Sequence, residues 1–130
     1  MIYLDASAAI TLFAHRRPAP ELRAFLAGHP GRPLATSTVG FVEIARGLDR
    51  IGSFPDVRDI LLRQFTEVLL TEEVRDAAFR VPPGLRTLDA LHVASAQAIG
   101  AALTMLVTYD QRMYKVARSL GLPVAAPGVN

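Results

Sequence analysis

Short apolar runs alternate along the chain with longer segments in which apolar residues recur every three or four positions. Residues 2–5 form the first run, and comparable runs occupy 34–37, 68–70, 104–108 and 124–126. Runs of this length, bounded by polar or turn-forming residues, are typical of buried strands. The pattern therefore predicts about five strands.

The segments between these runs have helical spacing and recognisable helix starts. Leu22, Phe25 and Leu26 repeat at three and four residues, which places them on one face of a helix. Thr38 is a candidate N-cap, and Thr71 stands before two acidic residues, which favour the positive end of a helix dipole. The predicted helices span 7–13, a segment around 22–26 between prolines, 38–48, 57–65, a segment from 72 to the Val-Pro-Pro-Gly break at 81–84, 87–99 and 110–120.

Alternating strands and helices need crossover connections, which produce a parallel sheet with helices on both faces. We expect an α/β fold, a three-layer α/β/α sandwich with a central parallel sheet of about five strands. The 130 residues have room for one domain, and the absence of cysteine excludes disulfides and thiol chemistry.

Neither a membrane span nor a secretory signal is expected. The longest weakly polar stretch, 98–107, has about ten residues, whereas about 20 are needed to cross a bilayer. The N-terminus carries an acid at position 5 and no basic residue before it, unlike a secretory signal. We expect a cytoplasmic protein without membrane contact.

Four acidic residues lie where an open parallel sheet binds its ligands, beyond the carboxyl ends of the strands. Asp5 ends the first predicted strand, and Asp110 follows the fourth by two residues. Glu43 lies about one turn inside the helix after the second strand, and Asp89 lies in the first turn of the helix before the fourth. We expect all four to converge at one edge of the sheet.

Each acid also has a purely structural interpretation. Asp110 could cap a helix, Asp89 could complement a helix dipole, and Glu43 could form a surface ion pair with Arg46. Asp5 is the hardest to explain in this way, because an unpaired charge at the end of an apolar strand is costly to bury.

Convergent carboxylates repel one another, and a divalent cation resolves the conflict. A ligand set made only of oxygen atoms suits Mg²⁺ or Mn²⁺. Such a cation activates water and neutralises charge on a phosphate, which is metal-assisted phosphodiester hydrolysis. Ser7 and Thr108, next to the acids in sequence, could order metal-bound waters or simply cap helices.

Small and basic residues near the acids favour a substrate with a phosphate backbone. Gly40 and Gly47 share a helical face with Glu43, and we interpret them as room for that backbone. All but one of the fourteen basic residues are arginine, whose planar fork suits phosphate, although a coding bias toward arginine explains this as well. The candidate phosphate contacts are Arg46, Arg86 and Arg112.

His92 follows Asp89 by three residues on the same predicted helix, which raises the possibility of a zinc site. The other two histidines, His15 and His29, have no acid at a matching spacing. We therefore interpret His92 as a structural residue or as one that supports a ligand.

The chain resembles the PIN-domain ribonucleases of the VapC toxin type over nearly its whole length, from Ile2 to about Pro127. Four motifs carry the resemblance in the family's order. They are I-Y-L-D-A-S-A with Asp5 and Ser7, T-V-G-F-V-E-I with Glu43, L-R-T-L-D-A-L-H-V-A with Asp89, and V-T-Y-D with Asp110.

The resemblance implies a Mg²⁺-dependent endoribonuclease, with Mn²⁺ as a substitute, that acts as the toxin of a type II toxin–antitoxin pair. It implies cleavage of structured RNA (transfer or ribosomal RNA), inhibition of translation, a cognate VapB-type antitoxin and a homodimer. Some relatives carry a further acid where this chain has Gln111 and Arg112, so the number of metal ions stays open. The implied catalytic and metal-binding residues are Asp5, Glu43, Asp89 and Asp110, with Ser7, Thr108, Arg86 and Arg112 supporting them or binding RNA.

Two alternatives belong to other functional classes. A receiver-type phospho-acceptor domain would need paired acids after the first strand and a lysine after the last, whereas this chain has Asp5 alone and Lys115 inside the final helix. A catalytically inactive PIN domain that binds RNA or acts as an adaptor is the stronger rival, but such proteins tend to lose acids that are all present here.

The two N-terminal helices carry more apolar bulk than one sheet face needs. This surplus suggests a groove for an amphipathic segment of the antitoxin, with ordinary core packing as the alternative. The residues concerned are Leu12, Phe13, Leu22, Phe25 and Leu26.

Overall fold

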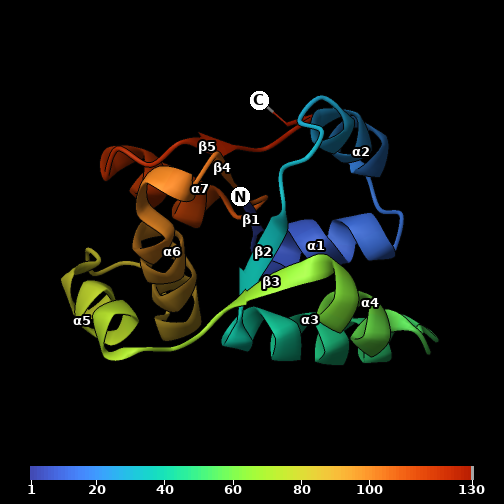
Figure 1. The fold of residues 1–130 in the computed structure, drawn as a ribbon, viewed down its shortest axis with the longest axis horizontal. Coiled ribbons are helices and arrows are strands. Elements are labelled where there is room, and N and C mark those ends of the chain that lie inside the picture. The colour runs from blue at the N-terminus through green and yellow to red at the C-terminus, as the bar shows by residue number, and fades with distance from the viewer. Residues whose placement is uncertain (130) are drawn as a thin grey trace.

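A parallel sheet of five strands in the order β3-β2-β1-β4-β5 runs through the centre of the molecule (Figure 1). The structure is a computed structural model that describes residues 1–129. The strands are β1 (Ile2–Leu4), β2 (Leu34–Ser37), β3 (Phe65–Val68), β4 (Met105–Val107) and β5 (Val124–Ala125). The helices are α1 (Ala6–Phe13), α2 (Ala19–Ala27), α3 (Thr38–Ile51), α4 (Val57–Gln64), α5 (Glu72–Arg80), α6 (Thr87–Ile99) and α7 (Gln111–Ser119), with a short 3₁₀ turn at Gly100–Ala102.

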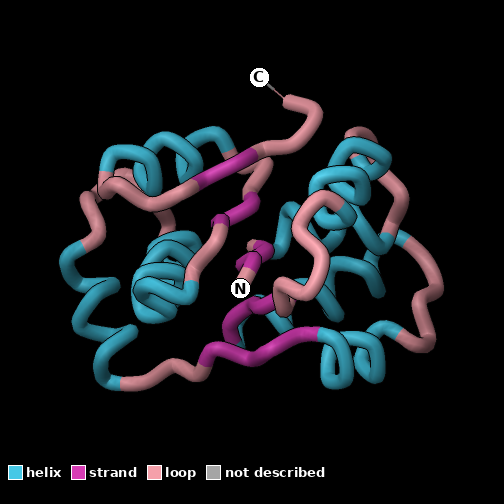
Figure 2. The backbone as a smooth tube through the Cα atoms, turned by 45° about the horizontal axis from the view of Figure 1, so that its top comes forward, coloured by secondary structure: helices cyan, strands magenta, loops and turns pink. Residues whose placement is uncertain are grey.

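Helices cover both faces of the sheet, which confirms the predicted three-layer α/β/α architecture. Figure 2 shows α1 to α4 on one side of the strands and α5 to α7 on the other. None of the helices within residues 1–129 is long and apolar enough to cross a membrane.

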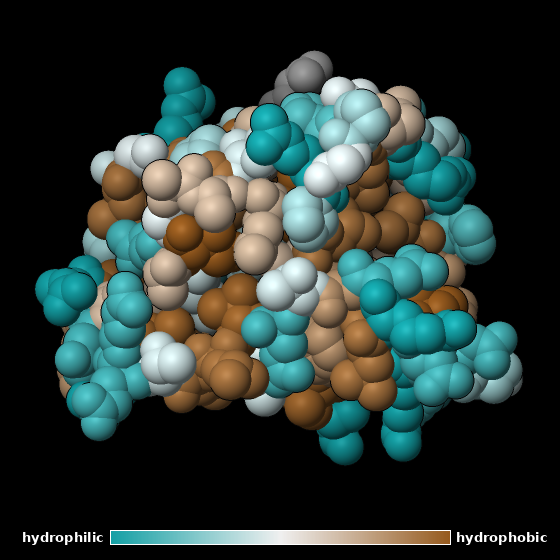
Figure 3. All heavy atoms as spheres, viewed as in Figure 1, coloured by the Kyte–Doolittle hydropathy of each residue, from teal (hydrophilic) through white to brown (hydrophobic). Residues whose placement is uncertain are grey.

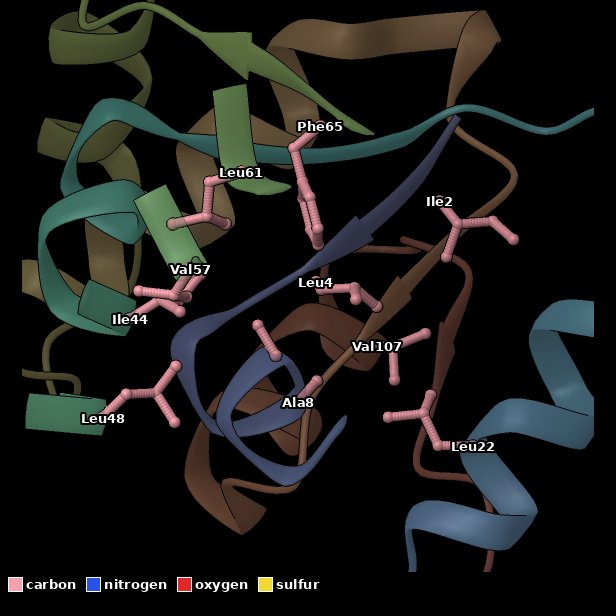
Figure 4. Close-up of a cluster of buried hydrophobic side chains, with 11 residues drawn as sticks. Ile2, Leu4, Ala8, Leu22, Ile44, Leu48, Val57, Leu61, Phe65 and Val107 are labelled. Atoms are coloured by element: carbon pink, nitrogen blue, oxygen red, sulfur yellow. The ribbon is translucent and has the colours of Figure 1, made fainter. Parts of the chain in front are cut away.

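The alternation of side chains along β1 explains how one short strand serves two layers. Ile2 and Leu4 pack into the core under α1 to α4, whereas Tyr3 packs into the core under α6 and α7, as expected for a strand buried on both faces. Figure 4 shows Leu4 and Val107 near the middle of the first core, with Leu22 of α2 on one side. The sheet is therefore held firmly at β1 and β4.

One predicted strand is wrong in position. The apolar run 68–70 predicts a buried strand, but β3 spans Phe65–Val68 at the edge of the sheet, and Leu69 and Leu70 are 62% and 46% exposed. Its pairing with β2 begins as soon as α4 ends, with Phe65 opposite Leu34. Figure 3 shows the molecule in the view of Figure 1. Hydrophobic residues lie at the surface across the middle of the face turned toward the viewer, where β3 lies.

The predicted cap of α3 is also wrong by one residue. Helix α3 begins at Thr38, and the hydroxyl of Ser37 accepts the Gly40 N–H at 3.0 Å, so Ser37 is the N-cap. The helix runs to Ile51, beyond the predicted end at 48. Helix α2 is longer than the predicted segment around 22–26, and the other predicted boundaries agree with the structure to within one residue.

The chain reverses its direction of travel across the sheet between β1 and β4. From β1 it moves outward to β2 and β3, and it then returns to form β4 on the other side of β1. Open α/β sheets bind ligands at such a switch point, beyond the carboxyl ends of the strands. The first and fourth acidic motifs lie at the ends of these two strands.

Candidate active site

A pocket of about 360 Å³ opens at the switch point, and all four predicted acids line it. Asp5 follows β1 directly and Asp110 follows β4, while Glu43 projects from α3 and Asp89 from the first turn of α6. Its lining residues are Asp5, Ala6, Ser7, Glu43, Arg86, Thr87, Leu88, Asp89, His92 and Asp110.

Asp5 is almost completely buried, with 2% of its surface exposed. Its Oδ1 accepts hydrogen bonds from the Ser7 hydroxyl at 2.7 Å and from the Ala8 N–H at 2.9 Å, and its Oδ2 accepts one from the Thr108 hydroxyl at 2.6 Å. Ser7 and Thr108 therefore hold Asp5 in place, and the alternative that they cap helices is wrong, because Asp5 caps α1 and Asp110 caps α7.

Burial raises the pKa of Asp5, since an ionised carboxylate loses solvation inside the protein. His92 and the donors from Thr108, Ser7 and Ala8 oppose this rise without cancelling it. Asp5 is thus a carboxylate that the fold orients firmly and that gains from a nearby cation.

Asp89 and Asp110 also influence each other across the pocket. Burial raises the pKa of Asp89, and the charges of Asp110 and Glu43 raise it further, while His92 and Arg86 lower it. Asp110 accepts the Met113 N–H at 2.9 Å as the N-cap of α7, so its structural interpretation holds, but the residue lines the pocket as well. The acids are close enough to repel one another.

Glu43 does not pair with Arg46. Its Oε1 lies 2.6 Å from Nε2 of His92, and Nδ1 of His92 lies 2.6 Å from the hydroxyl of Tyr3. His92 is 1% exposed, lines the pocket and contacts Glu43, which agrees with both of its predicted interpretations, a structural residue or one that supports a ligand. Tyr3 was not predicted for this region, although a phenol in an otherwise apolar strand two residues before Asp5 was a usable signal.

The two glycines of α3 do not open the site to a substrate. A Cβ atom on Gly40 would collide with the Thr36 hydroxyl of β2, and one on Gly47 would lie 2.7 Å from Cδ1 of Ile10 on α1. Both glycines let α3 pack closely against its neighbours, so the predicted interpretation as room for a substrate backbone is wrong.

Two of the three candidate arginines lie at the acids. Arg86 lines the main pocket, and Arg86 and Arg112 line an adjoining pocket of about 290 Å³ that also contains Asp89 and Asp110. Arg46 is exposed on α3 and is not among the residues that line these two pockets.

The donor set fits Mg²⁺ or Mn²⁺ because it consists of carboxylate oxygens that repel one another. Within residues 1–129, no three histidine, cysteine or acidic side chains stand close enough together to enclose a metal ion by themselves. Mg²⁺ does not need such a cluster, because it keeps several of its waters and takes only one or two carboxylates directly.

The raised pKa of Asp5 predicts that the metal-free protein becomes less stable as pH rises. A raised folded-state pKa contributes stability that is present below the ordinary value of 3.8 and is lost as pH rises through the folded-state value. Each pKa unit corresponds to about 1.4 kcal/mol, or about 5 °C for a chain of this size. In EDTA, we expect the melting temperature to fall as pH rises above 3.8 through the folded-state pKa of Asp5, and to fall less in Asp5→Asn. Equal slopes in the two proteins would contradict the prediction.

The PIN domain family matches residues 2–119 of the chain. Ribonuclease VapC47 of Mycobacterium tuberculosis (strain CDC 1551 / Oshkosh) is 39% identical over 133 residues, which cover 98% of each protein. Ribonuclease VapC46 of M. tuberculosis (strain ATCC 25618 / H37Rv) is 36% identical over 128 residues, which cover 97% of each.

Solved structures with the same fold include two of low sequence identity to this chain. M. tuberculosis VapC20, described as a Sarcin-Ricin loop cleaving toxin, has a TM-score of 0.72 at 16% identity and covers 98% of this chain and 100% of its own. VapBC2 from Rickettsia felis, solved with a DNA fragment from its promoter, has a TM-score of 0.73 at 16% identity, with 98% and 99% covered. At this identity the likeness shows the fold.

Proposed function

Since the chain belongs to the PIN-domain family and, within it, to the VapC ribonucleases, we propose that it is a metal-dependent endoribonuclease and the toxin of a type II toxin–antitoxin pair. The observation that carries this proposal is the gathering of four carboxylates in one pocket at the sheet's switch point. An inactive adaptor has no need to keep this repelling set together.

We propose Asp5 and Asp89 as the residues that hold Mg²⁺, or Mn²⁺ in its place, with Glu43 and Asp110 completing the site. Asp5 is the most firmly oriented of the four, through Ser7, Ala8 and Thr108. Asp89 is the carboxylate whose charge the neighbouring acids disfavour. A bound Mg²⁺ supplies an activated water and neutralises charge on the scissile phosphate.

The arginines beside the acids have a separate task in this proposal. Arg86 and Arg112 border the pocket, and a guanidinium can donate two parallel hydrogen bonds to a phosphate. We assign them to RNA backbone phosphates next to the scissile bond. There they would orient the RNA strand and leave the carboxylates free for the metal.

Structured RNA, in the form of transfer or ribosomal RNA, is the proposed substrate. Inhibition of translation is the proposed consequence of cleaving it. The test is incubation of the purified protein with end-labelled transfer RNA and ribosomal RNA fragments, with Mg²⁺ and with EDTA. Cleavage at a few positions that requires Mg²⁺ supports the proposal. Binding of the same RNAs without any cleavage would instead support the inactive RNA-binding alternative.

A VapB-type antitoxin is the proposed partner, and a groove on the two N-terminal helices, α1 and α2, is its proposed binding site. Of the five apolar residues predicted to form it, Leu22 is fully buried and belongs to the core, whereas Leu12, Phe13, Phe25 and Leu26 are half-buried. Leu12 and Phe13 line a pocket of about 360 Å³ together with the start of α4.

We expect Leu12→Ala to weaken binding of the antitoxin encoded beside this chain by about tenfold, the effect typical of losing an interface anchor. RNA cleavage by the free protein should change little, because Leu12 is not among the lining of the acidic pocket. Leu62→Ala on α4 is the matched control, since Leu62 is 69% exposed and is not among the lining of the groove. Calorimetry with the purified antitoxin measures the affinity of each variant. Equal losses of affinity in Leu12→Ala and Leu62→Ala would refute the assignment.

Three further parts of the proposal concern the whole protein. We propose that residues 1–130 form one nuclease domain, that the protein is cytoplasmic and that it is a homodimer. Exposed apolar side chains on α5 and at the start of α6, such as Phe79 at 79% and Leu88 at 46%, support self-association. Light scattering on the purified protein measures the oligomeric state.

A further inference from the structure

A chain of hydrogen bonds connects β2, β1, α6 and α3 behind the acidic pocket. The Ser37 N–H donates to the Tyr3 hydroxyl at 3.2 Å, Tyr3 contacts Nδ1 of His92 at 2.6 Å, and Nε2 of His92 contacts Glu43 at 2.6 Å. Ser37 and Tyr3 are completely buried and His92 is nearly so. Buried polar groups are costly unless they are paired, so each of these residues depends on its neighbours.

The chemistry of Tyr3 determines the direction of the hydrogen bonds. A phenol has one O–H to donate and an oxygen that can accept. Because this oxygen already accepts the Ser37 N–H, its own O–H is available to donate to Nδ1 of His92. In neutral His92, an Nδ1 that accepts leaves the hydrogen on Nε2, which donates to Oε1 of Glu43, and Nε2 also donates to Glu43 when the ring is protonated.

The result at Glu43 is a carboxylate held by one of its oxygens. Oε1 is bound to His92, while Oε2 accepts no hydrogen bond from the other residues between 1 and 129. The Glu43 side chain is 27% exposed and has several rotatable bonds, so without His92 it would sample many positions. Partners of this kind orient the ligands of metal sites in proteins.

We propose that His92, set in its tautomer by Tyr3, is a positioning residue that presents the free oxygen of Glu43 to the metal site. This inference rests on the proposed function, because it assumes that Glu43 contributes to binding a divalent metal. The competing explanation is that His92 only fills space between β1 and α6.

The substitutions His92→Gln and His92→Asn separate these explanations. Each places an amide near the position of one of the two ring nitrogens. The amide of Gln reaches as far as Nε2 and can still donate to Glu43, whereas the amide of Asn reaches only as far as Nδ1. In His92→Gln, the Tyr3 hydroxyl can turn to the Thr36 oxygen, which lies beside it and is buried without a partner within residues 1–129. We expect His92→Gln to bind Mn²⁺ within about threefold of the parent, and His92→Asn to bind it about tenfold more weakly.

The decisive measurement is a double-mutant cycle on the Kd for Mn²⁺, determined by calorimetry without RNA and well below the melting temperature of each variant. If His92 acts through Glu43, His92→Asn weakens binding about tenfold in the parent and less than twofold in a Glu43→Ala background. The same loss in both backgrounds, equal losses for the Gln and Asn variants, or no Mn²⁺ binding by the parent would overturn the inference.

Tyr3→Phe replaces His92→Asn in the cycle if that variant does not fold, since it removes only the phenol oxygen. A several-fold loss of Mn²⁺ affinity that disappears in Glu43→Ala supports the inference, and an unchanged or additive effect overturns it. The proposed function fails separately, if the parent cuts no RNA with Mg²⁺, because the cycle uses no RNA.

Discussion

Asp5→Asn should lower the rate of Mg²⁺-dependent RNA cleavage by at least about a hundredfold while the protein stays folded. A catalytic metal contributes several kcal/mol to stabilising a phosphate transition state, and each 1.4 kcal/mol is a factor of about ten in rate. Asn removes the charge that holds the metal but keeps the size of the side chain. Initial rates at saturating RNA and Mg²⁺, beside circular dichroism spectra, measure both parts of the expectation.

The fold should tolerate Asp5→Asn because the hydrogen bonds around it can be kept. The amide oxygen can still accept from Ser7 and from the Ala8 N–H, and asparagine is as good an N-cap as aspartate. The amide nitrogen would face the Thr108 hydroxyl, which can accept instead of donating. Asp49→Asn makes the same charge change at an exposed position on α3 and is the matched control. A folded Asp5→Asn protein that cuts RNA at the parent rate would show that the site is misassigned.

Asp89→Asn should melt at a higher temperature than the parent in EDTA near pH 7.5 and gain less stability from added Mg²⁺. Burial and the charges of Asp110 and Glu43 raise the pKa of Asp89, so its ionised form destabilises the native state once pH exceeds the folded-state value. Asn removes this repulsion. The relief must exceed the loss of a first-turn acid, which typically stabilises a helix by about 0.3–1 kcal/mol.

The response to Mg²⁺ has a definite size. At a hundredfold excess over its Kd, a ligand of the native state stabilises by about 2.7 kcal/mol, or about 10 °C for a chain of this length. A tenfold higher Kd in Asp89→Asn would halve this gain. Melting curves of both proteins with EDTA and with Mg²⁺ decide the matter. A variant that melts lower in EDTA and responds equally to Mg²⁺ would leave Asp89 as a helix-end residue only.

Most elements could be predicted because local signals and burial agree along the chain. β1 is a short apolar run, and α6 starts and ends where its spacing predicts. β3 could not be placed, because its edge position buries only Phe65 fully and leaves Leu69 and Leu70 exposed. At an edge, pairing with β2 determines the strand, and hydrophobicity then carries little information about its bounds.

The positions of the acids followed from the fold, but the contacts between them did not. A parallel sheet brings the ends of its strands together, so Asp5 and Asp110 could be assigned to one edge from their order alone. The pairing of Glu43 with His92 joins residues 49 positions apart on different helices. It depends on how α3 and α6, which lie on opposite faces of the sheet, contact each other. The spacing of residues within either helix does not predict that contact.

The double role of Asp5 and Asp110, each a helix N-cap that also lines the acidic pocket, bears on how a gene for such a nuclease changes over generations. A single G-to-A transition in the first codon position turns aspartate into asparagine, which caps a helix equally well. We therefore expect a change of one nucleotide at codon 5 to give an inactive protein that still folds.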